Sequence, residues 1–285
     1  MGNIIAFQGF SGAYSDMACR SVFPDWETMP CETFDDAFSA VQGGDAELAM
    51  IPVDNTLAGR VADVHHLMPK SGLYIIGEHF QPIEHSLLGI KGAKIEDLTH
   101  VHSHIHALPQ CRKIIKELGL KPQVHADTAG AAEEISRKGE KAHGAIASEL
   151  AARIYGLDVL KKDVQDADHN TTRFLVLARE ARVPLHSEAE DCLTSFIFRV
   201  RNIPASLYKS LGGFATNSIN MVKLESYVDE NFQAAQFYVD VVGHPEDRSF
   251  QLAMEELGFF AEDVTILGTY PAHRFRKKLL SQEGM

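Results

Sequence analysis

A polar segment, Asp166–Phe174, holds the densest group of side chains that could do chemistry. It places an amide at Asn170, a hydroxyl at Thr172 and a guanidinium at Arg173 directly before an apolar run. The planar guanidinium of arginine can donate two parallel hydrogen bonds to a carboxylate. Taken alone, the segment fits a capped turn with a surface arginine as well as it fits an anion-binding site.

Two further loops gather small and polar residues where predicted strands end. The loop Gly9–Ser15 opens a helix, so its glycines and its free backbone amides could approach an anion, although a tight turn would look the same. The segment Asp54–Thr56 follows a buried strand and fits either a helix cap or a ligand site. Ligands of open α/β sheets bind at the carboxyl ends of the strands, so both loops are candidates.

Three histidines alternate along one predicted strand, at His102, His104 and His106. Such alternation could hold a metal ion, but a zinc site usually needs further cysteine or carboxylate ligands at a workable spacing. No such ligands are obvious near this strand. We therefore expect no metal here and favour a role in a pocket for one of the histidines.

Short apolar strands alternate with helical stretches from residue 1 to about 180, which predicts a mainly parallel sheet covered by helices. The expected strands include Ile4–Gln8, Glu47–Val53, Gln123–His125 and Gly144–Ala147. The expected helices include Tyr14–Val22, Asp35–Val41, a helix from Thr128 to Arg137, and Ser148–Tyr155. Thr33 and Thr128 are the residue types that cap helix starts, and we assign each as a cap.

The chain is expected to divide after residue 180. Residues 181–191 lack periodicity and contain a proline and three acidic residues, which favours a linker. Residues 192–273 then repeat the order strand-helix-strand twice, the ferredoxin-like α+β arrangement. Pro204 should begin its first helix, residues 264–267 should form its last strand, and residues 274–285 should be a loose tail.

Composition excludes several classes of function. The net charge is −12 and no part of the chain is a basic module, so neither nucleic acid nor an anionic membrane is an expected partner. Four cysteines without CxxC spacing favour free thiols in a reducing cytoplasm. The N-terminus lacks a basic leader and its apolar run is short, so we expect a cytoplasmic protein.

Several ordered segments resemble the prephenate dehydratase family. Asn170, Thr172, Arg173 and Phe174 match its Asn-x-Thr-Arg-Phe signature, and the resemblance extends over roughly residues 4–178. The other matching segments are Gly9–Ser15, Ile51–Thr56, Ser103–Arg112 and Ala145–Leu157. Residues 192–273 resemble an ACT domain, the family's usual phenylalanine sensor, through matches between Pro204 and Ser226. They depart from it where Tyr227 and Val228 replace an arginine and a proline.

The resemblance implies a lyase that converts prephenate to phenylpyruvate, water and carbon dioxide without a cofactor. It implies a catalytic domain with two α/β lobes, like the type 2 periplasmic binding-protein fold, with the site in the cleft. It also implies a regulatory ACT domain that binds L-phenylalanine and pairs in a homodimer or tetramer. Two alternatives stay open: an arogenate dehydratase, which does the same chemistry on the aminated substrate, and a non-catalytic sensor of small molecules.

The residues carried over from the family form three predicted groups. Catalysis is assigned to Thr172, Arg173 and His104, with Thr172 donating a hydrogen bond to the departing hydroxyl and His104 examined first as the proton source. Substrate binding is assigned to Ser11, Gly12, Asn55, Thr56, Ser103, Asn170 and Phe174. Binding of the effector is assigned to Pro204, Ala205, Ser206, Leu207, Asn217, Ile219, Asn220, Glu225 and Ser226.

Overall fold

The structure is a computed structural model that describes residues 2–188, 192–201, 203–228 and 234–276. Its backbone contacts define two compact units. Unit 1 comprises Met1–His65 and His79–Leu175, and unit 2 comprises His66–Glu78 and Val176–Met285. The boundaries predicted for the linker and the tail fall partly outside the described residues and stay predictions. No helix of the described chain is long and apolar enough to cross a membrane.

The first lobe of unit 1 is built on a sheet with the strand order β2-β1-β3-β11-β5, and β4 pairs with β3. Strand β1 lies between β2 and β3, is parallel to both, and buries Ile5, Ala6 and Phe7 completely. The strands are β1 (Ile4–Gln8), β2 (Glu27–Cys31), β3 (Leu48–Asn55), β4 (Gly59–Arg60), β5 (Tyr74–Pro82) and β11 (Thr171–Ala178). The helices that connect them are α1 (Tyr14–Val22), α2 (Phe34–Gly43), α3 (Ala62–Leu67) and the 3₁₀ turn Met68–Lys70. By backbone contacts, this turn, the first part of β5 and the last part of β11 belong to unit 2.

The second lobe is built on a sheet with the order β10-β6-β9-β7-β8, in which β7 runs parallel to β8 and β9. Its strands are β6 (Ser86–Gly89), β7 (His100–His104), β8 (Lys121–His125), β9 (His143–Ala147) and β10 (Asp158–Lys161). Its helices are α4 (Arg112–Glu117), α5 (Thr128–Lys138) and α6 (Glu149–Tyr155), with 3₁₀ turns at Ile95–Asp97 and Leu108–Cys111.

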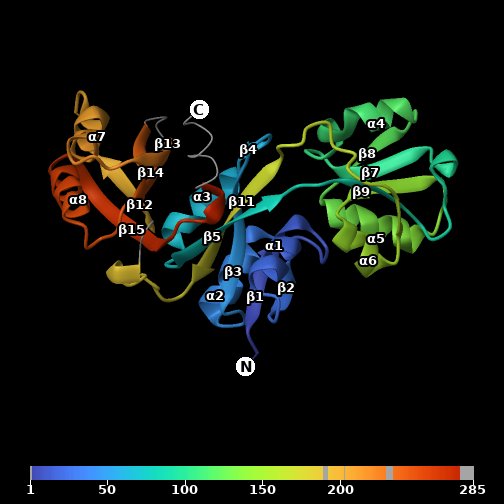
Figure 1. The fold of residues 1–285 in the computed structure, drawn as a ribbon, viewed down its shortest axis with the longest axis horizontal. Coiled ribbons are helices and arrows are strands. Elements are labelled where there is room, and N and C mark those ends of the chain that lie inside the picture. Colours follow the sequence, from blue (N-terminus) through green and yellow to red (C-terminus); the bar gives the residue numbers. More distant parts are fainter. Residues whose placement is uncertain (1, 189–191, 202, 229–233, 277–285) are drawn as a thin grey trace. The chain divides into compact units, whose positions relative to one another are not determined.

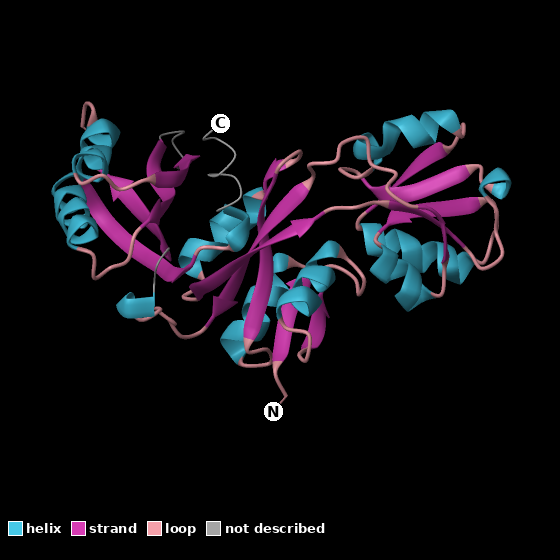
Figure 2. Ribbon diagram, in the orientation of Figure 1, coloured by secondary structure: helices cyan, strands magenta, loops and turns pink. Residues whose placement is uncertain are grey.

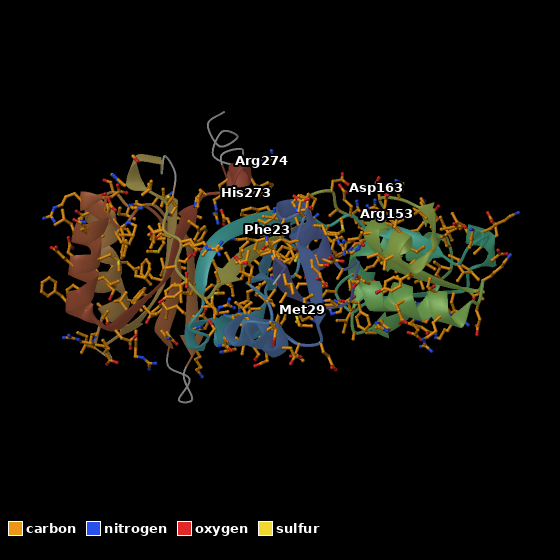
Figure 3. All side chains as sticks on the ribbon, turned by 90° about the horizontal axis from the view of Figure 1, so that it is seen from below. Phe23, Met29, Arg153, Asp163, His273 and Arg274 are labelled. Carbon is orange, nitrogen blue, oxygen red and sulfur yellow. The ribbon has the colours of Figure 1, made fainter. Side chains whose placement is uncertain are left out.

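Alternation along the strands of the second sheet gives it two buried faces. Leu88 and Ala145 pack with α5 and α6, whereas Leu87 and Ile146 pack with α4 on the opposite side. Figure 2 shows helices on both sides of this sheet, and side chains fill the space between helices and strands (Figure 3). A sheet covered on both faces needs apolar residues at consecutive positions, as these strands have.

The chain enters the second lobe after β5 and returns to the first sheet at β11, so unit 1 consists of two α/β lobes joined by two crossings (Figure 1). The predicted two-lobed α/β fold is confirmed to this extent. Its likeness to periplasmic binding proteins stays a prediction.

Unit 2 contains an antiparallel sheet with the strand order β13-β14-β12-β15. Phe196, Phe198 and Val239 share the face that α7 and α8 cover. The elements are β12 (Cys192–Val200), α7 (Ser206–Thr216), β13 (Met221–Val228), β14 (Ala234–Val242), α8 (Arg248–Phe260) and β15 (Ala261–Pro271), preceded by the 3₁₀ turn His186–Glu188. This is the predicted order of strand-helix-strand, twice.

Unit 2 also includes His66–Glu78, although the sequence analysis predicted that the second unit would contain residues after 180 alone. Glu78 is 8% exposed and pairs with Arg276 through two contacts, Nε to Oε1 at 2.7 Å and Nη2 to Oε2 at 2.8 Å. The backbone amide of His273, labelled in Figure 3, donates to the same carboxylate at 3.0 Å. A two-point pair of this kind fixes both partners in orientation.

Three local predictions were wrong. The cap of α5 is Asp127, one residue before Thr128, and its Oδ1 accepts from the amides of Ala129 and Gly130. Helix α7 begins at Ser206, after Ala205 in the left-handed conformation at φ 60°, so Pro204 lies outside the helix. The last strand is longer than residues 264–267, because its pairing with β12 continues to Pro271.

Candidate active site

A cavity of about 250 Å³ lies in unit 1 and is lined by residues of both lobes. Strands β1, β3 and β7 end at it, which is where α/β sheets present ligand-binding groups. The polar side chains that line it are Gln8, Tyr14, Ser15, Asn55, His85, His104, His106, Gln110, Asp127, Thr128, Asn170 and Thr172. Five predicted site residues from three parts of the chain therefore meet here: Asn55, His104, and the group Asn170, Thr172 and Phe174.

The side chain of Asn55 is fixed in orientation by the backbone. Its Oδ1 accepts hydrogen bonds from the amides of Leu57 at 2.9 Å and Ala58 at 2.8 Å. Because both partners can only donate, the oxygen and the nitrogen of this amide are distinguished. Its Nδ2 donates to Asn170 Oδ1 at 2.8 Å and to Thr172 Oγ1 at 2.9 Å.

The same reasoning continues along a chain of side chains, which we call the amide relay (Asn55, Asn170, Gln110, His85 and Tyr14). Asn170 Nδ2 donates to Gln110 Oε1 at 2.7 Å, and that oxygen also lies 3.1 Å from His85 Nε2. An amide oxygen accepts only, so His85 carries a hydrogen on Nε2. Burial lowers the pKa of His85 to about 4, so the ring is neutral at pH 7 and its Nδ1 is an acceptor. The Tyr14 hydroxyl oxygen lies 2.8 Å from this Nδ1 and 2.7 Å from the carbonyl oxygen of Glu84, so these two acceptors share its one hydrogen.

The relay determines what Thr172 can do. Its oxygen accepts from Asn55, so its own hydrogen must point elsewhere. Within the described residues, no hydrogen bond uses that hydrogen, and Thr172 lines the cavity together with Phe174. The hydroxyl of Thr172 is therefore oriented as a donor to whatever the cavity holds.

His104 also presents a hydrogen to the cavity. Its Nδ1 accepts from the backbone amide of His106 at 3.3 Å, so the neutral ring carries its hydrogen on Nε2. Burial lowers the pKa of His104, and neighbouring His106 lowers it further, against a smaller opposing effect of Asp127. The ring is thus a neutral hydrogen-bond donor near pH 7 rather than a cation.

A helix start supplies further donors. Helix α1 begins after Ala13 without a side-chain cap, so its first backbone amides keep their hydrogens for a ligand. Ser15, in this first turn, lines the cavity and is 9% exposed. Free amides and the positive end of a helix dipole are suited to a carboxylate.

Arg173 does not line the cavity. Side chains alternate along β11, so Thr172 and Phe174 face the cavity while Arg173 points to the other side of the strand. There it is 6% exposed, and its Nη1 lies 3.9 Å from Asp54 Oδ2. The geometry gives no support to the predicted contact between Arg173 and a substrate carboxylate.

Ser11 and Gly12 also lie outside this cavity, although Ser11 lines a second cavity beside it, and both residues connect the two lobes. The backbone oxygen of Ser11 accepts from the Tyr155 hydroxyl at 2.9 Å, and that of Gly12 accepts from Ser148 Oγ at 2.5 Å. Gly12 has φ 89°, and a Cβ at this position would lie 2.7 Å from the Cα of Ala151. The glycine is therefore required for close packing of the first loop on α6.

The side chains of Thr56 and Ser103 likewise make hydrogen bonds within the fold and do not line the cavity. Thr56 Oγ1 donates to the carbonyl of His169 at 2.9 Å and accepts from the amide of Thr171 at 3.0 Å, which holds β3 beside β11. Asp54–Thr56 do not cap a helix, because the chain first turns back through β4, and the next helix, α3, begins only at Ala62. Ser103 is fully buried and donates to the carbonyl of Ile146 at 2.6 Å, away from the cavity.

The family model of prephenate dehydratase matches residues 5–182, which include every residue of this cavity. The chain belongs to the prephenate dehydratase family. It is accordingly an enzyme, a lyase, and the non-catalytic alternative is set aside.

Three relatives illustrate the range of this prephenate dehydratase family. A bifunctional N-acyl-homoserine lactone acylase/prephenate dehydratase of Komagataeibacter europaeus is 52% identical, over 96% of this chain and 98% of the relative. Arogenate dehydratase 2 of Petunia hybrida is 40% identical, over 94% of this chain and 71% of the relative. The structure of prephenate dehydratase in complex with L-Phe from Arthrobacter aurescens is similar, with a TM-score of 0.85 and 26% identity, over 94% of this chain and 90% of that one.

The effector residues expected from the prephenate dehydratase resemblance do not gather at one place within this chain. Pro204–Leu207 lie at the start of α7, whereas Asn217–Asn220 follow its end. Asn217 itself caps the end of the helix, with Nδ2 donating to the carbonyl of Gly213 at 2.8 Å. Glu225 and Ser226 lie on β13, which continues as a strand through the substituted Tyr227 and Val228.

Eight polar residues that line the cavity were not predicted as site residues: Gln8, Tyr14, Ser15, His85, His106, Gln110, Asp127 and Thr128. Tyr14, Ser15 and Gln110 stood inside segments that resemble the prephenate dehydratase family, which was the available signal. His85 had none, because a lone histidine before an apolar strand is more often a core or surface residue.

Proposed function

We propose that the enzyme catalyses the decarboxylating dehydration of prephenate to phenylpyruvate. The bond between the ring and its carboxylate breaks, and its electron pair enters the ring as carbon dioxide leaves. The bond between the ring and its hydroxyl breaks at the opposite carbon, and the departing oxygen takes a proton to form water. Aromatisation drives both steps, so the protein needs to bind the substrate and stabilise the departing oxygen.

The orientation of Thr172 is the observation that carries this proposal. Asn55 donates to its oxygen, which directs the Thr172 hydrogen to the cavity and towards the departing hydroxyl. A hydrogen bond that strengthens as negative charge develops on that oxygen lowers the barrier. An alcohol is too weak an acid to transfer the proton itself near neutral pH, so Thr172 polarises the leaving group. His104 Nε2 is a second donor in the same cavity, and a bound water can supply the proton.

Replacing Thr172 tests the assignment. Thr172→Ala should lower kcat for phenylpyruvate formation by about 100- to 1,000-fold, the scale observed for loss of one oriented donor. Thr172→Ser keeps the hydroxyl and should retain activity within about tenfold. Near-normal turnover by the alanine variant would remove Thr172 from the mechanism.

Arogenate is a second candidate substrate for the same site. The identity with the Petunia enzyme supports it, and the chemistry is unchanged because the amino group lies on the side chain, away from the breaking bonds. Assays of phenylalanine formation from arogenate, beside phenylpyruvate formation from prephenate, distinguish the two.

Hydrolysis of N-acyl-homoserine lactones is a candidate of a different class. A cavity of about 600 Å³ adjoins the first one and is walled in part by Phe10, Pro30, Cys31 and Tyr155, which suits an acyl chain. The 52% identity with the Komagataeibacter protein supports it as well. Burial raises the pKa of the Cys31 thiol, which disfavours a thiolate nucleophile. Release of homoserine lactone, measured by mass spectrometry, is the direct test, and its absence would exclude this activity.

Feedback control by L-phenylalanine belongs to the proposal. Unit 2 has the order and topology that the ACT resemblance implies, and the Arthrobacter relative was crystallised with L-Phe. Since the predicted effector residues lie at both ends of α7, we place the site between two copies of the chain, in a homodimer or tetramer. Equilibrium sedimentation and calorimetric titration with L-phenylalanine test the two parts. A monomer, or no heat of binding with unchanged activity, contradicts them.

A further inference from the structure

We propose that Asp127 recognises an ammonium group on the substrate side chain, so that it raises selectivity for arogenate over prephenate. This inference rests on the dehydratase activity proposed above. Asp127 begins α5 in the second lobe and lines the cavity that Thr172 lines from the first lobe. It also lines the adjoining cavity, so its carboxylate lies where the two meet.

Only one oxygen of Asp127 is used by the fold. Oδ1 accepts from the amides of Ala129 at 2.6 Å and Gly130 at 3.0 Å, which satisfies the start of the helix. A serine or an asparagine would cap α5 equally well. The second oxygen, Oδ2, makes no hydrogen bond to any residue that the structure describes. The cap therefore does not explain why this position carries a carboxylate.

The glycine loop leaves room for this second oxygen. Gly9 has φ 115°, and a Cβ on it would lie 2.7 Å from Asp127 Oδ2. A side chain at position 9 would push the carboxylate away from its place beside the loop. The backbone conformation at Gly9 and the position of Oδ2 therefore fit each other across the two lobes.

The electrostatic surroundings favour a cation beside Oδ2. Neither cavity is lined by a lysine or an arginine in the part of the chain that the structure describes, and the second also contains Glu32. Prephenate brings two carboxylates and no positive group. Arogenate brings the same two carboxylates and one ammonium. A fixed carboxylate repels the first ligand and gives the second a charge-assisted hydrogen bond.

The geometry of the substrate agrees with this placement. Its hydroxyl and its side chain lie at opposite ends of the six-membered ring. A substrate whose hydroxyl meets Thr172 in the first lobe thus extends its side chain towards the opposite lobe, where Asp127 lies. The ammonium takes no part in bond breaking, so Asp127 acts through substrate binding and specificity.

The test compares kcat/KM for both substrates in the full-length protein and in Asp127→Asn. Asparagine keeps the cap and removes the charge. We expect about a 10- to 100-fold loss with arogenate, mainly through KM, because a hydrogen bond to a charged partner is removed. With prephenate we expect no loss or a gain of a few fold. Asp127→Ser, which also caps, should shift the ratio in the same direction and covers the case in which Asp127→Asn misfolds.

A second carboxylate of α5 provides the matched control. Glu134 lines neither cavity and pairs with Lys138, so Glu134→Gln removes a charge from the same helix without touching the substrate. Its ratio of kcat/KM should stay within about threefold of the wild type. An unchanged ratio in both Asp127 variants, or wild-type enzyme active on prephenate alone, overturns the inference. Wild-type enzyme inactive on both substrates overturns the proposed function instead.

Discussion

The candidate active site and the predicted effector set are built in opposite ways. Asn55 and Thr172 are 117 positions apart, yet their side chains are hydrogen-bonded at 2.9 Å. The effector residues all lie between 204 and 226, yet their two main groups lie at opposite ends of α7, a helix of 11 residues. At a rise of about 1.5 Å per residue, a helix of this length holds its ends roughly 16 Å apart.

This difference shows that strand pairing can bring distant residues together, whereas a helix keeps its two ends apart. Sheet pairing brings β3 and β11 together and fixes Asn55 beside Thr172, so this part of the candidate site forms within one chain. A single helix cannot fold its two ends together, which is why the proposed effector site is placed between two copies of the chain. Damage to the amide relay should therefore appear in catalysis, whereas damage inside unit 2 should appear first in stability.

Replacing the amide N–H donor of Asn55 by an acceptor should have the largest effect on kcat/KM. In Asn55→Asp, a carboxylate oxygen faces Asn170 Oδ1 where an N–H donated before, and Thr172 loses its donor. Two buried hydrogen bonds are lost and two acceptors face each other, which corresponds to a fall of about 100- to 1,000-fold in kcat/KM. Steady-state kinetics on prephenate measure it.

The neighbouring Thr56 provides the control for this prediction. Its hydroxyl joins β3 to β11 without lining the cavity, so Thr56→Val tests loss of strand contacts alone. We expect the Thr56 variant to lose stability with kcat/KM within about tenfold of the wild type. Equal kinetic losses in the two variants would mean that Asn55 acts through the sheet and not through Thr172.

Breaking the charge pair of unit 2 should reduce stability. Glu78→Gln leaves the guanidinium of Arg276 with a neutral partner at a site where the carboxylate is buried. Removing one member of a buried pair costs about 3 kcal/mol. For a chain of this size that lowers Tm by roughly 6–12 °C. Calorimetry gives Tm, and the KM for prephenate should stay within about threefold; a KM change without a Tm change would reverse the comparison between the two units.

Most helices and strands could be predicted from the sequence because local patterns of apolar and turn residues mark where they begin and end. Strand β1 and helix α1 have the predicted bounds, since apolar runs and turn residues mark their ends. The cap of α5 was assigned one residue late because Asp127 and Thr128 are both capping types, and only the backbone conformation distinguishes them. The sequence could not predict that His66–Glu78 belong to unit 2, because this depends on a contact with Arg276, which is distant in the chain.

The site was predicted in part, for a similar reason. Motifs located Asn55, Asn170 and Thr172, but a motif does not tell which side chains share a face. Strand alternation places Arg173 opposite Thr172, and that could have been read from the strand assignment itself. His85 could not be found, because its role depends on Gln110 and Tyr14, which reach it from other elements.

The smallest expected effect is on the pH dependence of stability, compared between a buried histidine of the site, His85, and one outside it, His102. Burial lowers the pKa of His85 and of His102 to about 4 in each case, below the ordinary value near 6.5. The unfolded chain then binds protons that the folded chain does not, so stability is fully present above pH 6.5 and falls as pH drops from 6.5 to 4. Each histidine accounts for roughly 2–3 kcal/mol across that window.

Urea unfolding at pH 7.5 and pH 5.0 measures this loss. His102 lies outside the cavity, where its Nε2 lies 2.8 Å from His143 Nδ1, so His102→Gln should flatten the pH dependence of stability while kcat/KM keeps its pH profile. His85→Gln should flatten it too and also reduce kcat/KM, because Gln110 and Tyr14 lose their common partner. His169→Gln, at an exposed histidine, is the matched control and should leave the pH dependence as it was. Identical profiles in all three variants would mean that neither buried ring is held neutral by the fold.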